Sequence, residues 1–175
     1  MKVVIDTNVL LVADKQHGDI TDTCLSNCVT KLLELQVRGH VVIDDGYRII
    51  GEYQNKLDAN HGKNMGAAFL KWLLQNQANP RHVERIRITE TSANHFEEFP
   101  SPELELEFDP PDCKFIAVAN AHPQKPTIWQ AADSKWLNWW PMLQVYGIQV
   151  EFLCSEDVVR FYREKFPDQD IPALP

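Results

Sequence analysis

Short apolar runs, rich in β-branched or aromatic residues and each too short for a helix, constrain the fold of this chain most strongly. The runs favour buried strands at residues 2–5, 41–43, 127–130 and 149–153, and the alternating segment 85–89 favours a half-exposed strand. Helical patterns lie between them, at residues 21–38, 44–59, 65–77, 112–119, 134–140 and 155–166. Strands that alternate with helices pack as a parallel sheet with right-handed crossovers. We therefore expect a three-layer α/β/α fold with a central parallel sheet.

The length of 175 residues favours one domain. The formal net charge is −8, but it is unevenly distributed. Residues 56–87 hold six Lys or Arg and two acidic residues, whereas residues 90–112 hold eight acidic residues and no Lys or Arg. The acidic segment is a linker flanked by prolines, which disfavour helix in the preceding residue. We predict a single domain spanning 1–175, with an insertion at about 60–110.

The absence of long apolar runs and the spacing of the cysteines predict the compartment of the protein and the state of its thiols. The first residues lack the long apolar core of a signal peptide, and no apolar run approaches the roughly 20 residues that a bilayer requires. We therefore expect a cytoplasmic protein without a membrane partner. Its cysteines, Cys24, Cys28, Cys113 and Cys154, are then expected as reduced thiols. Cys24 and Cys28 are four residues apart and lack the spacing and second pair of a zinc site.

Acidic residues lie at the carboxyl ends of predicted strands, where parallel sheets bind their ligands. Asp6 follows the strand at 2–5, and Asp133 follows the strand at 127–130. If these strands are neighbours where the strand order reverses, both carboxylates face one crevice. Asp112, at a helix start, and Glu52, on the second helix, can join them. Singly, each residue has a simpler role as a turn residue, a helix cap or a solvated charge.

Four such residues together indicate a shared site. Clustered carboxylates raise one another's pKa unless a cation neutralises them, so the cluster predicts binding of a divalent metal ion. Ligands that are all oxygen atoms point to Mg²⁺ or Mn²⁺ as the cofactor.

Over most of its length the chain resembles the PIN-domain nucleases. The resemblance rests on the segments Val4–Leu11, Ile50–Tyr53, Asp112–Ala119 and Ala132–Leu137. It implies a metal-dependent endoribonuclease that hydrolyses phosphodiester bonds and leaves 5′-phosphate and 3′-hydroxyl ends. The catalytic metal ligands that it implies are Asp6, Glu52, Asp112 and Asp133.

The resemblance also implies further contacts. Asn8 and Ser134 would lie behind the metal ligands or touch substrate, and many small family members are toxins with an antitoxin protein as partner. Residues of the basic stretch are candidates for binding RNA, namely Lys63, Arg85 and Arg87. The spacing of 60 residues from Glu52 to Asp112 is long for a minimal member, and Asp109 competes with Asp112 for the ligand role.

Other readings of the same residues stay open. A phosphotransferase of the haloacid dehalogenase type requires a second aspartate two residues after the first, where this chain has Asn8, and a receiver domain requires paired acids and a lysine. The stronger alternative is a PIN-like binding or scaffold module with weak catalysis that engages a partner protein. Four tryptophans between residues 129 and 140 favour core packing, and exposure of Trp139 or Trp140 would favour a homodimer.

Overall fold

A five-stranded parallel sheet forms the centre of the computed structural model, which describes residues 1–175. The strand order is β3-β2-β1-β6-β7, so β1 lies in the middle. Its strands are β1 (Lys2–Ile5), β2 (His40–Asp44), β3 (Val83–Ile86), β6 (Thr127–Gln130) and β7 (Val150–Phe152). Every pair of neighbours in this sheet is parallel. Strand β1 is apolar and nearly fully buried, as a strand covered on both faces must be.

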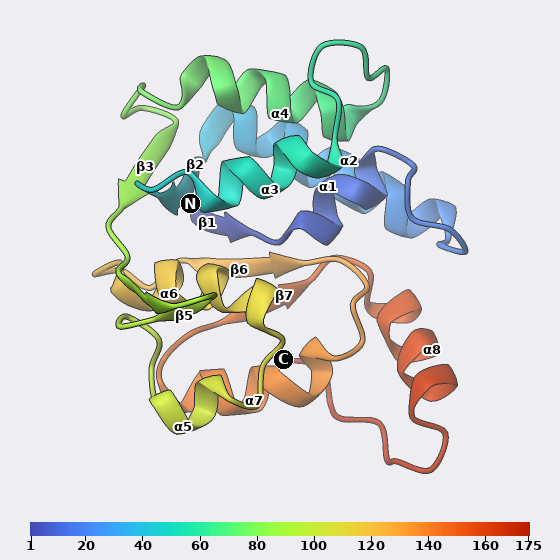
Figure 1. Cartoon of the computed structure of the whole chain (residues 1–175). Coiled ribbons are helices and arrows are strands. Elements are labelled where there is room, and N and C mark those ends of the chain that lie inside the picture. Colours follow the sequence, from blue (N-terminus) through green and yellow to red (C-terminus); the bar gives the residue numbers. More distant parts are fainter.

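Helices cover both faces of this sheet, which confirms the three-layer α/β/α arrangement (Figure 1). Helices α1 (Thr7–Ala13), α2 (Asp22–Arg38) and α4 (Met65–Asn76) pack on one another, and α3 (Arg48–Lys56) contacts both α4 and α6. Helix α6 (Cys113–Ala121) packs against β1, β2 and β6. The remaining helices are α5 (Pro102–Glu105), η1 (Pro110–Asp112), α7 (Trp136–Val145) and α8 (Ser155–Lys165).

The chain from about 60 to 110, expected as an insertion, contains two parts. Helix α4 and strand β3 belong to the central fold, and β3 pairs with β2 as an edge strand. A separate antiparallel hairpin follows, formed by β4 (Glu90–Ser92) and β5 (His95–Phe96), before α5. The strand expected at 85–89 lies at 83–86 instead, because the buried Val83 pairs with Val41 of β2.

Two further differences concern the start of the chain and its cysteines. Helix α1, which the sequence patterns did not predict, begins directly after β1, because the Asp6 carboxylate caps it by accepting the N–H of Asn8 at 2.8 Å. The expectation of reduced thiols is wrong for Cys24 and Cys154, which form a disulfide. The fold places their Cα atoms 4.7 Å apart although 130 residues separate them in sequence.

None of the helices is long and apolar enough to cross a bilayer.

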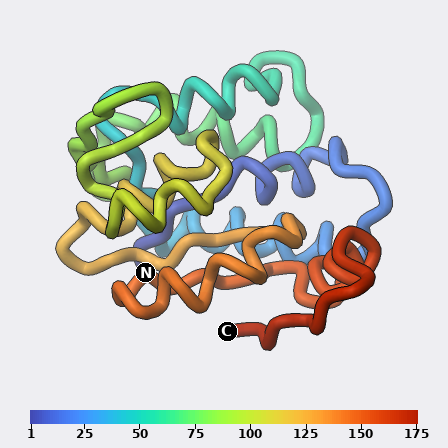
Figure 2. The backbone as a smooth tube through the Cα atoms, turned by 60° about the horizontal axis from the view of Figure 1, so that its bottom comes forward, coloured from blue at the N-terminus to red at the C-terminus, as the bar shows by residue number.

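The tryptophans act mainly as core residues, as the sequence indicated. Trp129 and Trp136 are fully buried, and Trp139 is 7% exposed. Trp140 is half-buried, and its indole N–H donates to the carbonyl of Ala173 at 3.0 Å. The end of the chain therefore returns to α7, as the backbone tube shows (Figure 2).

Helices α1 and α4 approach each other closely at Gly66. An added Cβ there would meet the carbonyl oxygen of Leu10 and would lie 2.6 Å from the Cβ of Asp14. We expect Gly66→Ala to lower the free energy of unfolding by about 1–3 kcal/mol, because the backbone of α1 has to shift. Gly51→Ala is the matched control, since nothing lies within 4 Å of its added Cβ, and it should stabilise α3 by about 0.5–1 kcal/mol. Urea unfolding measures both changes, and equal effects of the two substitutions would contradict this account.

Candidate functional site

The pairing of β1 with β6 brings Asp6 and Asp133 to one edge of the sheet. Ile5 pairs with Trp129, and the N–H of Asp6 donates to the carbonyl of Trp129 at 2.9 Å. The strand order reverses between these strands, so Asp6 and Asp133 lie at the topological switch point of the sheet. Asp6 is almost fully buried, and Asp133 is half-buried with one carboxylate oxygen 3.1 Å from the N–H of Lys135.

Helix α3 carries Glu52 to the same edge. The Thr7 hydroxyl donates to one oxygen of the Glu52 carboxylate, and the Lys114 ammonium group pairs with the other. The neighbouring Tyr53 hydroxyl donates to the carbonyl of Ile5, which fastens α3 to the end of β1. Glu52 is therefore held by three elements: its own helix, the start of α1 and the start of α6.

Asp112 is the residue of the acidic linker that joins the cluster. It ends η1 immediately before α6, and its half-buried carboxylate makes no hydrogen bond or ion pair with any residue. The Asp109 carboxylate instead pairs with the Lys135 ammonium group. The structure thus places Asp112, rather than Asp109, with Asp6 and Asp133.

Burial and mutual repulsion shape the electrostatics of the cluster. Burial raises the pKa of Asp6 to about 7, with further contributions from Asp133 and Glu52. Burial likewise raises the pKa of Asp112 to about 8, and the charges of Asp6 and Asp133 add to this shift. The Lys114 ammonium group opposes both shifts. The cluster is therefore short of positive charge near neutral pH.

Lys114 is the site residue that the sequence analysis missed. Its side chain is only 6% exposed, and its ammonium group also donates to the carbonyl of Pro111. The available signal was a lone lysine in the first turn of an otherwise apolar helix, two residues after Asp112. A buried lysine requires a paired acid, which here is Glu52.

Asn8 and Ser134 contact or belong to the loop that carries Asp133. The Asn8 side-chain oxygen accepts the N–H of Ala132 at 2.9 Å, so it holds the loop that carries Asp133. Ser134 is buried in the same loop, and its carbonyl accepts the N–H of Leu137 at 3.1 Å. Asn8 therefore positions a carboxylate through the backbone.

An open groove of about 630 Å³ borders the cluster at Glu52 and Lys114. Its basic residues are Arg48, Lys56 and Lys114. Of the candidates named from the sequence, none lines the groove, and Arg85 donates to the hydroxyl of the lining residue Tyr47 at 2.9 Å. Lys63 and Arg87 are exposed and do not line it.

Comparisons with known proteins add no assignment to this geometry. No protein-family model, no curated protein and no solved structure matches the chain.

The raised pKa values predict how stability depends on pH in the presence of EDTA. The ordinary carboxyl pKa of 3.8 applies to the unfolded chain, whereas Asp6 and Asp112 have values of about 7 and about 8 in the fold. The folded state binds more protons between these values, so the stabilisation is present below about pH 4 and is lost as the pH rises through about 7 to 8.

Asp112→Asn should flatten this dependence because an amide does not ionise. We expect its free energy of unfolding at pH 9 to exceed that of wild type by about 1.4 kcal/mol for each pKa unit of the removed shift. Denaturant unfolding at pH 5 and pH 9 measures the effect. Asp109→Asn, outside the cluster, should keep the wild-type dependence, and identical slopes for all three proteins would refute the electrostatic argument.

Proposed function

We propose that the chain is a divalent-metal-dependent phosphodiesterase that cleaves RNA and leaves 5′-phosphate and 3′-hydroxyl ends. The observation that carries this proposal is the meeting of four carboxylates from separate segments at one edge of the sheet. They are Asp6, Glu52, Asp112 and Asp133, and two of them have pKa values near neutrality. The resemblance to PIN-domain nucleases supports the same activity.

The residues fit a hard divalent cation. All four donors are oxygen atoms, and the Asp112 carboxylate has no partner of its own within the protein. No three of the four residues offer carboxylate oxygens that all lie within 4.8 Å of one another. Mg²⁺ and Mn²⁺ keep several water ligands and use one or two carboxylates together with substrate phosphates. Asp6, Asp112 and Asp133 would therefore hold the ion partly through its water molecules, with Glu52 beside them.

Several side chains keep these ligands in place without touching the reacting atoms. Asn8 holds the loop of Asp133, and Thr7 and Lys114 orient Glu52. When bound, the ion supplies an activated water molecule and stabilises the charge that develops on the phosphate oxygens. The protein therefore needs no side-chain nucleophile.

The groove beside the cluster offers a path for a phosphate backbone. Although the chain has a net charge of −8, three basic residues line this groove. Arg48 is already paired with Glu90 at 2.9 Å, and Lys114 is paired with Glu52. Lys56 is exposed and forms no ion pair, so it is the cation best placed to contact a phosphate.

Metal binding and cleavage are tested on the same samples. We expect calorimetry to detect Mn²⁺ binding by the wild type, and a labelled RNA to be cleaved only when Mn²⁺ or Mg²⁺ is present. Asp6→Asn and Asp112→Asn should each lower the cleavage rate by at least about 100-fold, which is ~2.7 kcal/mol of barrier. Asp109→Asn should retain activity, because its carboxylate pairs with Lys135.

Three outcomes separate the alternatives. If the wild type binds the metal ion and cleaves RNA, and Asp112→Asn does neither, the nuclease proposal is supported. Metal binding without cleavage favours the scaffold module that engages a protein partner. No metal binding by the wild type would exclude the proposed activity.

The role of Lys56 predicts a change in RNA affinity. Lys56→Gln should weaken binding of a single-stranded RNA severalfold and reduce the slope of log affinity against log salt concentration by about 0.7. Lys63→Gln is the control, since Lys63 is exposed but lies outside the groove. Fluorescence anisotropy at several salt concentrations measures both, and equal losses for the two variants would contradict the groove as the binding path.

A further inference from the structure

Three cysteines from two distant parts of the chain form a buried cluster outside the acidic site. Cys24 on α2 is bonded to Cys154 at the start of α8, and the Sγ of Cys28 lies 3.7 Å from the Sγ of Cys154. The three sulfur atoms all lie within 4.8 Å of one another. No side chain in the cluster is more than 3% exposed.

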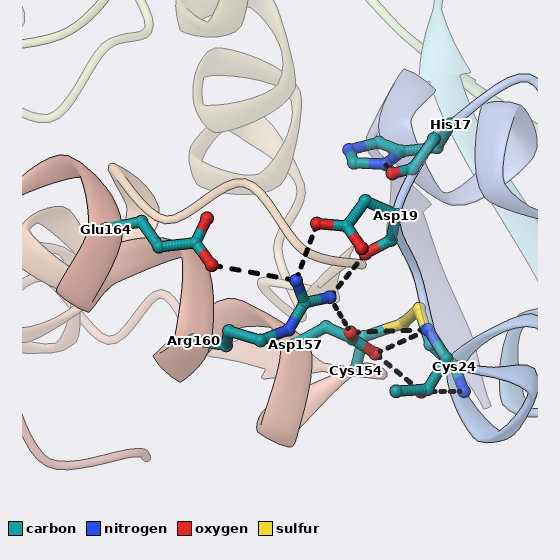
Figure 3. A network of polar contacts seen from close by, with 9 residues as sticks. His17, Asp19, Cys24, Cys154, Asp157, Arg160 and Glu164 are labelled. Atoms are coloured by element: carbon teal, nitrogen blue, oxygen red, sulfur yellow. Dashed lines mark hydrogen bonds and ion pairs between the residues drawn. A yellow bond between two sulfur atoms is a disulfide. The ribbon is translucent and has the colours of Figure 1, made fainter.

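A network of polar contacts lies beside the disulfide between Cys24 and Cys154 (Figure 3). The Arg160 guanidinium group donates to the carboxylates of Asp19 and Asp157, at 2.8 and 2.7 Å. Asp157 also accepts the hydroxyl of Thr21 at 2.7 Å, and that hydroxyl accepts the N–H of Cys24 at 3.1 Å. The network fixes the start of α2 against α8, and thereby the positions of the cysteines.

The spacing of the sulfur atoms matches that of ligands on one metal ion. Two thiolates bound at ~2.3 Å from an ion lie ~3.8 Å apart in tetrahedral geometry and ~4.0 Å apart in trigonal geometry. The distance of 3.7 Å between the sulfur atoms of Cys28 and Cys154 is close to both values. Reduction of the Cys24–Cys154 bond would free a third thiolate, whose sulfur lies within 4.8 Å of that of Cys28.

The cluster offers three ligands and no free fourth one. No histidine nitrogen or carboxylate oxygen joins the three sulfur atoms within 4.8 Å, and the nearby Asp157 carboxylate is occupied by Thr21 and Arg160. Structural Zn²⁺ sites are almost always four-coordinate. Three soft thiolates without a fourth donor are better suited to Cu⁺.

Two helix N-termini contribute local positive charge at the cluster. Cys24 lies in the first turn of α2, and Cys154 is the residue before α8, so the partial positive charges of both helix ends lie close to these two cysteines.

We propose that Cys24, Cys28 and Cys154 form a three-coordinate thiolate site for Cu⁺ when the disulfide is reduced. A dithiol reductant supplies the two electrons and two protons that convert the Cys24–Cys154 bond into two thiols, and the dithiol itself becomes a disulfide. Binding of Cu⁺ then releases one proton from each of the three thiols. Disulfide and metal complex are alternative states of the same residues, and this proposal is independent of the acidic site.

Cu⁺ titration of the reduced protein tests the site. The full chain is reduced with dithiothreitol, freed of it under anaerobic conditions, and titrated with Cu⁺ against a chromogenic Cu⁺ chelator. We expect one Cu⁺ per chain, thiolate-to-copper charge-transfer absorption, and three sulfur ligands by X-ray absorption. Zn²⁺ should bind at least tenfold more weakly, and the air-oxidised protein should bind neither ion.

Variants separate this site from general thiol binding. Cys28→Ala removes one ligand but retains both cysteines of the disulfide, and it should lower the Cu⁺ affinity at least tenfold. Cys113→Ala removes the other free buried cysteine, on α6, and should bind like the wild type. Circular dichroism verifies folding. The proposal is overturned if the reduced wild type unfolds or takes up no Cu⁺, if Cys28→Ala binds normally, or if Zn²⁺ binds more tightly than Cu⁺.

Discussion

Parallel pairing of β1 with β6 determines where the acidic residues of this protein meet. The connections after β1 and β6 leave the sheet at the same edge, and the strand order reverses between them. The backbone N–H of Asp6 extends this pairing by one residue beyond β1, to the carbonyl of Trp129. The same aspartate then caps α1 through its side chain. One residue thus ends a strand, starts a helix and contributes a carboxylate, and the positions of Glu52 and Asp133 depend on the elements that it joins.

The fold brings the acidic residues together although burial and mutual repulsion disfavour their charged forms. Desolvation and repulsion both favour the protonated forms of Asp6 and Asp112, and within the cluster Lys114 supplies the opposing charge. The ammonium group of Lys114 is committed to Glu52 and the carbonyl of Pro111. The fold therefore tolerates a deficit of positive charge at this edge of the sheet. Strongly shifted pKa values of this kind occur in functional sites and also in structural ion-pair networks.

The sequence predicted those parts of the fold that depend on local patterns. Buried strands such as β1 and β6 contain short apolar runs. The helix expected from residue 44 begins at Arg48 instead, and the Asp44 carboxylate accepts the N–H groups of Arg48 and Ile49 in its first turn. Asp6 and Asp133 followed from the rule that ligands collect at the carboxyl ends of parallel strands.

The sequence patterns could not predict features that depend on packing between distant segments. Helix α1 has only seven residues, most of them buried, so it lacks the polar face that identifies a longer helix. The pairing of Cys24 with Cys154 joins segments 130 residues apart, and spacing in the sequence does not specify such a partner. The ion pair of Lys114 with Glu52 has the same origin, since 62 residues separate them.

The disulfide closes a covalent loop that includes four of the five strands of the central sheet and leaves out the fifth. The covalent loop closed by Cys24 and Cys154 contains β2, β3, β6 and β7, but not the central strand β1. Loop closure limits the conformations open to those four strands in the unfolded chain. Strand β1 lies on the free segment before the loop and has to enter between β2 and β6, with no cross-link to guide it. In the oxidised protein, the strand that carries Asp6 is thus the one member of the sheet that relies on noncovalent contacts alone to find its place.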